Sequence, residues 1–123
     1  MARARWSTAG PTEAFAADGV HGVSLEDAFG RTLAVIRRGD DLFAFVDQCP
    51  HRGLPFSEHG HLDETGALVC GWHAWSFCLE NGTHTEFPSV TVGTFPIRIR
   101  DDQVEIDLAA PTGGGPWAPP EIN

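Results

Sequence analysis

Hydrophobic and polar residues alternate along much of the chain with the two-residue period that is typical of β-strands. Two pairs of such runs, rich in β-branched and aromatic residues, are separated by short polar turns, which predicts two β-hairpins. The runs are TLAVIRR (32–38) with DLFAFVD (41–47), and FPIRIR (95–100) with QVEIDL (103–108). We therefore expect an all-β fold made of antiparallel strands.

The middle of the chain predicts shorter strands. ALVC (67–70) is a brief apolar run, and WSFCLE (75–80) leads into Asn81-Gly82, a dipeptide that favours a tight hairpin turn. One helical element is expected elsewhere, a single turn around SLEDAF within residues 21–30.

The length of 123 residues suits one domain and is too short for two ordinary ones. Hydrophobic residues make up 41% of the chain, which allows a packed core, and 14 glycines with 9 prolines favour a loop-rich β domain. We divide the chain into an N-terminal extension (1–12), the domain (13–108) and a tail rich in proline and glycine (109–123).

The chain is strongly acidic, with a net charge of −9 from 17 acidic residues and 8 basic ones. Such a surface repels nucleic acid and anionic lipid, and it favours an electropositive protein partner. No apolar run is long enough for a membrane helix or a signal peptide, and three cysteines do not make a disulfide framework. We expect a cytoplasmic protein that binds neither nucleic acid nor membrane.

Two cysteine–histidine pairs carry the candidate chemistry. Cys49 and His51 form a Cys-x-His pair, Cys70 and His73 form a Cys-x-x-His pair, and eighteen residues lie between the pairs. Four such ligands suit a structural zinc ion or a [2Fe–2S] cluster. One residue between Cys49 and His51 is a short spacing for a single tetrahedral ion, whereas a cluster lets each pair divide between two irons. The spacing favours the cluster without excluding zinc.

The segments CPHRG, CGWHAWSF and ENG resemble the signature of Rieske-type ferredoxins and oxygenase Rieske domains, over residues 42–82. The resemblance implies a small antiparallel β domain with two cluster-binding loops at one end. It also implies one [2Fe–2S] cluster per chain, with Cys49 and Cys70 on one iron and His51 and His73 on the other.

Residues beside the expected ligands predict a low reduction potential. Trp75 and Phe77 occupy positions where high-potential members of the family carry serine and tyrosine, whose hydroxyls stabilise the reduced cluster. Leu54 and Trp72 lie where those members carry extra cysteines that form a disulfide. We therefore expect a potential toward the lower end of the Rieske span of about −150 to +300 mV.

Two further roles are expected of residues in these loops. Gly53 and Gly71 would let backbone N–H groups approach the cluster sulfides. An apolar collar around the cluster would serve as a docking face, as a shield against water, or as both, and it consists of Leu54, Pro55, Phe56 and Trp72.

The remaining cysteine and the neighbouring histidines are given simpler roles. Cys78 is expected to be a small buried residue. His59 and His61 are expected to be solvated, because no cysteine lies at a matching spacing.

The resemblance implies a soluble one-electron carrier between a flavin-containing ferredoxin reductase and a terminal oxygenase. Two alternatives keep the cluster: a Rieske-like small subunit of a reductase such as nitrite reductase, and the Rieske part of an oxygenase. The latter needs a second domain with a mononuclear iron site, which these 123 residues lack, so we expect no enzymatic activity from this chain alone. An alternative of a different class is a zinc-stapled interaction module.

Overall fold

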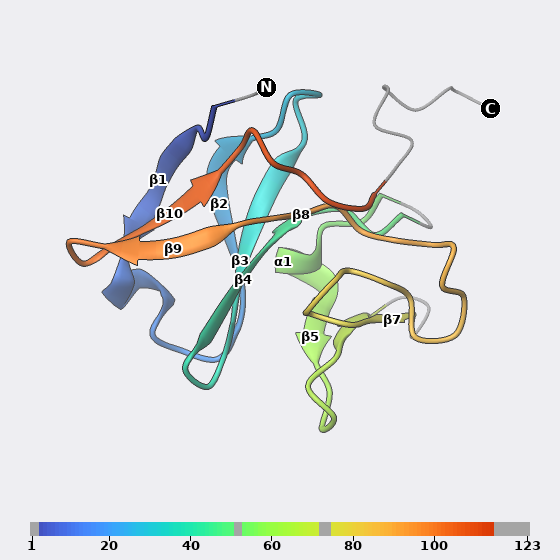
Figure 1. Ribbon diagram of the computed structural model, residues 1–123. Helices are drawn as coiled ribbons and strands as arrows, with labels where there is room; N and C mark the ends of the chain where they lie inside the picture. The colour runs from blue at the N-terminus through green and yellow to red at the C-terminus, as the bar shows by residue number, and fades with distance from the viewer. Residues whose placement is uncertain (1–2, 51–52, 72–74, 115–123) are drawn as a thin grey trace.

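The protein, described by a computed structural model over residues 3–50, 53–71 and 75–114, is built almost entirely of β-strands (Figure 1). The expected all-β fold is confirmed, with three antiparallel sheets. Their strand orders are β1-β10-β9, β2-β3-β4-β8 and β5-β6-β7. The strands are β1 (Trp6–Pro11), β2 (Gly19–Glu26), β3 (Thr32–Arg38), β4 (Asp41–Val46), β5 (Gly60–Leu62), β6 (Leu68–Cys70), β7 (Ser76–Phe77), β8 (Thr94–Phe95), β9 (Ile97–Arg100) and β10 (Gln103–Asp107). A 3-10 helix, η1 (Thr12–Phe15), and one turn of α-helix, α1 (Phe56–His59), complete the described elements.

The largest sheet contains the predicted hairpin of β3 and β4. These strands pair from Leu33 with Val46 to Arg38 with Asp41, and Gly39 in the turn has a φ of 63°. Residues 33–36 are fully buried, because side chains on both faces of β3 are covered. A strand buried on both faces reads as a continuous apolar run, which is the pattern of this segment.

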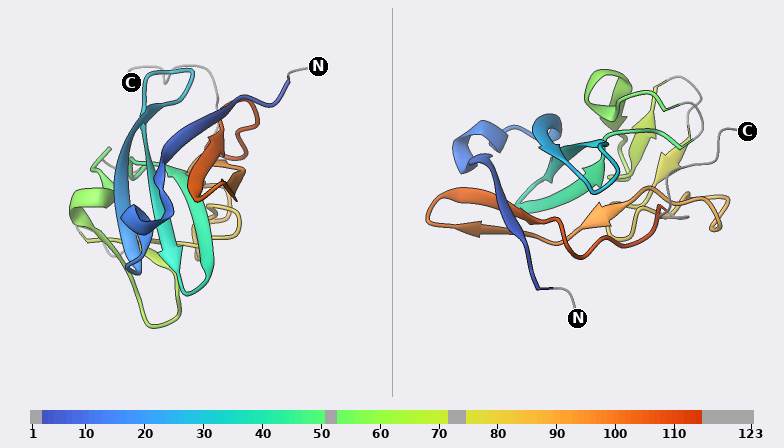
Figure 2. Two further views of the ribbon diagram at one scale, coloured as in Figure 1. Left: turned by 90° about the vertical axis from the view of Figure 1, so that its left-hand side faces the viewer. Right: turned by 90° about the horizontal axis from the view of Figure 1, so that it is seen from above.

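The second predicted hairpin joins β9 to β10. Its turn residues, Asp101 and Asp102, have φ values of 53° and 61°, which a type I′ turn requires and which aspartate tolerates better than most residues. Figure 2 shows this sheet and the larger one as two layers, with the core between them. Val104 and Ile106 of β10 contribute fully buried side chains to that core.

The third sheet lies at the other end of the molecule, beside α1 (Figure 1). It shares the hydrophobic core of the two larger sheets, since Phe56, Leu68 and Phe77 belong to the same cluster as Leu33 and Phe45. One continuous core therefore supports both the sandwich and the part of the chain that carries the cysteines.

The chain ends differ from the expected division. Residues 6–11, expected in an N-terminal extension, form β1 and pair with β10. The segment was missed because WSTAGP has no clear alternation of polar and apolar residues. Within the expected tail, Thr112 exchanges two backbone hydrogen bonds with Thr94, at 2.8 and 2.9 Å.

The turn of helix expected within residues 21–30 is wrong. Residues up to Glu26 continue β2, because they pair with β3. A tight turn follows, in which Asp27 Oδ1 accepts backbone N–H bonds from Phe29 and Arg31. Among the described residues, no helix has the length and apolar character needed to cross a membrane.

Candidate metal centre

Cys49 and Cys70 begin two loops that close in the same way. The backbone N–H of Cys49 donates to the carbonyl of Leu54 at 2.9 Å, and that of Cys70 donates to the carbonyl of Trp75 at 2.8 Å. Each closure spans five residues, so the two loops match in length. His51 and His73, the expected imidazole ligands, belong to these loops and lie outside the described residues.

Both cysteines lie at the buried base of their loops. Cys49 is 0% exposed and Cys70 is 1% exposed, and neither is part of a disulfide. A thiolate in apolar surroundings is unfavourable unless a cation stabilises it, and a bound metal does this directly. The donor chemistry therefore fits a thiolate-ligated metal centre whose sulfur side faces the core.

A buried carboxylate fastens the two ends of the first loop. Asp47 accepts a hydrogen bond from the backbone N–H of Ser57 at 2.9 Å and another from its hydroxyl at 2.5 Å. Ser57 lies in the first turn of α1, where N–H groups have no partner within the helix, and Pro55 offers no side-chain cap. Asp47 thus caps α1 and links it to the end of β4, on either side of Cys49.

Pairing with β5 holds the second loop. Cys70 pairs with Gly60, and the N–H of Gly71 donates to the carbonyl of His59 at 2.8 Å. A Cβ atom at Gly71 would collide with that same carbonyl oxygen. Glycine is therefore required here by a close approach of two backbones.

The amides of the two loop glycines make hydrogen bonds within the protein. The N–H of Gly53 donates to the carbonyl of Cys49 at 2.6 Å, and the N–H of Gly71 is bonded to His59. Both amides are thus used to shape the loops, and the expectation that these glycines let backbone N–H groups approach the cluster sulfides stays a prediction. Gly53 also has a φ of 73°, a left-handed conformation that closes the first loop.

Aromatic side chains pack on the core side of the cysteine loops. Phe77 is fully buried and packs edge-to-face against Phe56 at 5.8 Å and Trp75 at 6.5 Å between ring centroids. No hydroxyl is available at residue 77, and water is excluded from this side of the site. The surroundings agree with the expected low potential, because hydrogen bonds to the cluster raise it.

The expected docking face needs one correction. Phe56 is 1% exposed and belongs to the core, so it cannot contact a partner. Its side chain turns inward because it starts α1 and packs on Phe77. Leu54 and Pro55 are half-buried, and Trp72 lies outside the described residues.

His84 was given no role from the sequence, yet the structure places it beside the second loop. Its ring is 4.7 Å from that of Trp75, and its side chain is 2% exposed. Neither spacing nor neighbouring residues in the sequence indicate this placement, because it follows from the bridge between Phe77 and His84.

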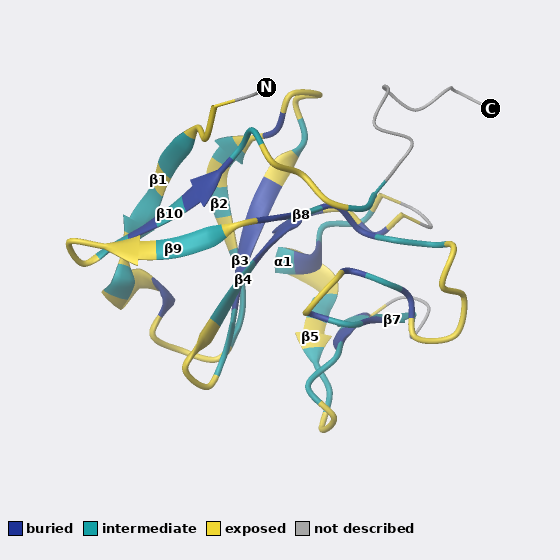
Figure 3. Cartoon of the chain, in the orientation of Figure 1, coloured by how far each residue is buried: buried dark blue, intermediate teal, exposed yellow. Residues whose placement is uncertain are grey.

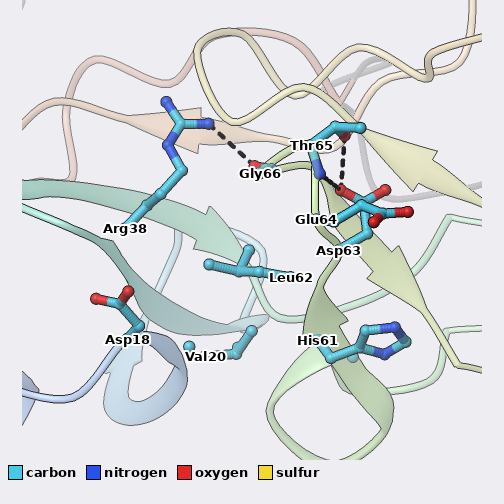
Figure 4. Close-up of a pocket in the computed structure, with 11 residues that line it drawn as sticks. Asp18, Val20, Arg38, His61, Leu62, Asp63, Glu64, Thr65 and Gly66 are labelled. Atoms are coloured by element: carbon cyan, nitrogen blue, oxygen red, sulfur yellow. Dashed lines mark hydrogen bonds between the residues drawn. The ribbon is translucent and has the colours of Figure 1, made fainter.

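A cleft of about 660 Å³, lined by both polar and apolar residues, lies between β2, β3 and the β5–β6 turn (Figure 4). Arg38 lies at its edge and donates to the carbonyl of Gly66 at 3.0 Å, and it pairs with Glu80, whose carboxylate pKa it lowers. Figure 4 shows His61 on the far side from Arg38, exposed as expected. Within the described part of the chain, no three His, Cys, Asp or Glu side chains are grouped to hold a metal ion.

The fold, the paired loops and the buried thiols coincide with a match to a known family. Residues 5–96 match the family model described as the Rieske [2Fe–2S] domain. The chain belongs to the Rieske [2Fe–2S] family. This confirms the resemblance, and it decides for a [2Fe–2S] cluster over the zinc ion that the ligand spacing left open.

Relatives with this domain include ferredoxin subunits of dioxygenases. The 3-phenylpropionate/cinnamic acid dioxygenase ferredoxin subunit of Escherichia coli (strain K12) is 30% identical over 93 residues, covering 75% of this chain and 87% of that protein. The protein of the same name from Shigella flexneri serotype 5b (strain 8401) is similar to the same extent.

Solved structures show the same fold. A chain in the complex of reduced oxygenase and oxidized ferredoxin in carbazole 1,9a-dioxygenase superposes with a TM-score of 0.71 at 24% identity, covering 85% of this chain and 94% of that chain. A proposed NADH-dependent nitrite reductase small subunit from Mycobacterium tuberculosis gives 0.72 at 22% identity, covering 85% of this chain and 96% of that chain. A longer chain from a carbazole-bound oxygenase and ferredoxin complex superposes with a TM-score of 0.73 at 21% identity. The match covers 86% of this chain and 29% of that longer chain.

Proposed function

We propose that this chain is the Rieske ferredoxin component of a multicomponent oxygenase. It carries single electrons from a flavin-containing ferredoxin reductase to the terminal oxygenase. The observation that carries the proposal is the 30% identity to dioxygenase ferredoxin subunits, which spans 87% of the relative's length. The acidic surface supports it, because a charge of −9 speeds encounter with electropositive partners.

The ligand assignment is part of the proposal. Cys49 and Cys70 would hold one iron through thiolates, and His51 and His73 would hold the other through imidazoles. The bound cluster supplies one chemical capacity, the uptake and release of one electron. Two thiolates and two neutral imidazoles leave it less negative than four thiolates would, which raises its potential above that of all-cysteine clusters.

The surrounding residues keep the site rigid and dry. The matched backbone closures and the Asp47–Ser57 bonds hold the loop ends, and with them Cys49 and Cys70, in place. The rings of Phe56 and Phe77 keep water from the core side of the site. These features suit a carrier that exchanges electrons without catalysing a reaction of its own.

The cytoplasmic location belongs to the same proposal. None of Cys49, Cys70 and Cys78 is joined in a disulfide, which suits a reducing compartment. The second candidate is a tightly held small subunit of a reductase, since the nitrite reductase structure shares the fold. A carrier exchanges between its partners, whereas such a subunit co-purifies with a large enzyme.

Cysteine variants test the ligand assignment with an internal control. Cys49→Ser and Cys70→Ser should each abolish the visible absorbance and the iron content of the purified protein. Cys78→Ser should retain both, because Cys78 lies after β7 and outside the two loops. A Cys70→Ser protein with a full iron content would contradict the assignment.

A reconstituted electron-transfer chain tests the function. NADH, a flavin-containing reductase and this protein should drive hydroxylation by the terminal oxygenase of the same organism. Turnover should depend on the concentration of this protein and should stop when it is omitted. Turnover that is unchanged without it would refute the proposal.

A further inference from the structure

Phe87 is a large apolar side chain left in solvent. It is 53% exposed and lies in the loop of residues 85–90, between β7 and β8. Figure 3 shows the exposed part of this loop as the outermost stretch on the right. Single exposed hydrophobic residues are common on protein surfaces, so exposure alone assigns no role.

The loop around Phe87 is built by His84. The Nδ1 atom of His84 accepts two backbone hydrogen bonds, from the N–H of Glu86 at 2.9 Å and from the N–H of Phe87 at 3.1 Å. The backbone N–H of His84 donates to the carbonyl of Val90, and the N–H of Val90 donates to the carbonyl of Phe87. Four bonds therefore fix the conformation in which Phe87 is presented.

The histidine also connects this loop to the second cysteine loop. Because Nδ1 accepts two bonds, the ring proton lies on Nε2, and that atom is buried without a hydrogen-bond partner among the described residues. The ring packs against Trp75, at 4.7 Å, and Phe87, at 4.9 Å, and the rings of Trp75 and Phe87 contact each other at 6.4 Å between centroids. Trp75 is the residue whose carbonyl closes the loop that begins at Cys70. The exposed phenyl ring is thus held by both His84 and Trp75, beside the base of the cluster site.

We propose that Phe87 is the side chain that anchors this protein on the terminal oxygenase, and that His84 is the residue that positions it. The inference rests on the proposed function, because it names the contact through which that function is performed. Interfaces obtain most of their binding free energy from a few preorganised anchors, and aromatic residues are prominent among them.

The place and charge of the loop argue for the electron acceptor as its occupant. Electron transfer slows steeply with distance, so a redox partner must bind beside the cysteine loops, where Phe87 lies, and a chain with this fold is known in complex with an oxygenase. Glu86, next to it, is exposed, and the chain carries a net charge of −9. The matching surface on the oxygenase is an apolar pocket for Phe87 with arginine or lysine residues on its rim, since opposite charges steer the encounter.

Ile99 provides a matched control. It is 55% exposed, but it lies on β9, at the opposite end of the molecule from residues 85–90 (Figures 1 and 3). Phe87→Ala and Ile99→Ala remove exposed apolar side chains of similar accessibility, so a general effect of surface hydrophobicity would appear in both.

The experiment measures oxygenase turnover against the concentration of each variant after chemical reduction, which bypasses the reductase. Phe87→Ala should raise the KM of the oxygenase for its carrier by about tenfold or more, with kcat, the reduced EPR spectrum and the reduction potential unchanged. Ile99→Ala should match the wild-type protein. Equal KM values for Phe87→Ala and the wild type would overturn the proposal. A separate assay of reduction by the reductase would also overturn it if the defect of Phe87→Ala were confined to that step.

Variants of His84 test the positioning role. His84→Leu should raise the same KM although Phe87 is present, because the N–H groups of Glu86 and Phe87 lose their shared acceptor, Nδ1. His84→Asn should restore most of the affinity, since its Oδ1 atom occupies a similar place to Nδ1. Failure of the Asn variant to improve on the Leu variant would refute this role. If the wild-type protein supports no turnover, the proposed function itself fails; if it does and Phe87→Ala is normal, the docking inference alone fails.

Discussion

Replacing Asp47 with alanine should loosen the first cysteine loop and release the cluster. Asp47 is 5% exposed and makes both of its side-chain bonds to Ser57, across the base of the loop that contains Cys49. Alanine removes both bonds, and it leaves the N–H of Ser57 without its cap at the start of α1. The two ends of the loop are then joined by backbone alone.

The size of the effect follows from the two lost bonds. Hydrogen bonds to a charged group contribute about 1.5–3 kcal/mol each, and Ser57 is partly open to water, so the lower end applies. A combined loss of about 3 kcal/mol in unfolding free energy corresponds to a decrease of about 10 °C in apparent Tm for a chain of this size. Asp47→Asn should lose only about 1 kcal/mol, because Oδ1 is retained and the amide can donate to the Ser57 hydroxyl.

The assay follows cluster release by visible absorbance and unfolding by circular dichroism in the same samples. Asp63→Ala is the control, since Asp63 also accepts several bonds, but within the exposed turn at Thr65–Ala67. It should affect Tm without accelerating cluster release. If Asp47→Ala holds its cluster as long as Asp63→Ala does, Asp47 does not fasten the loop.

Three further predictions concern the potential, acid stability and backbone packing. Phe77→Tyr should raise the reduction potential, because the new hydroxyl can donate a hydrogen bond to the reduced cluster. A preference of about 1 kcal/mol for the reduced state corresponds to about 40 mV. An unchanged potential in protein-film voltammetry would refute this role of the hydroxyl. The backbone N–H groups of Arg5 and Ala109 lower the pKa of Asp107 below 3.8. The stabilisation that Asp107 contributes is therefore present above the ordinary carboxyl pKa and is lost as pH falls through the lowered pKa. In an acid titration, the stability of Asp107→Asn should depend less on pH below about 4 than that of the wild type. A stability profile parallel to the wild type would contradict this. Gly71→Ala should destabilise the second loop by about 2–4 kcal/mol, measured by denaturant unfolding, because Cβ meets the His59 carbonyl; an unchanged midpoint would refute the clash.

Much of the fold could be predicted because local patterns and tertiary pairing agree. The runs at residues 32–38 and 41–47 have both the alternation and the turn that a hairpin needs, and they form β3 and β4. β1 could not be predicted in this way, because its pairing with β10 depends on residues about a hundred positions away. The helical expectation around SLEDAF failed for the same reason, since pairing with β3 outweighs a weak local preference.

The candidate site, too, could be predicted only in part. The cysteine–histidine spacing indicates candidate ligands and restricts the metal centre to zinc or a [2Fe–2S] cluster, because coordination chemistry restricts which residues can serve, and the family match decides between the two. The supporting contacts of Asp47, Gly71 and His84 carry no such pattern, since each depends on which strands and loops become neighbours. Gly71 shows the limit most clearly: its position in the loop was evident, but the close approach of the His59 carbonyl was not.

Chemical analysis combined with EPR spectroscopy of the freshly purified protein tests the central claim most directly. Two irons and two acid-labile sulfides per chain, with a rhombic EPR signal that develops only after reduction by dithionite, are the predicted result. A colourless protein with one zinc ion per chain, no labile sulfide and no signal after reduction would contradict it.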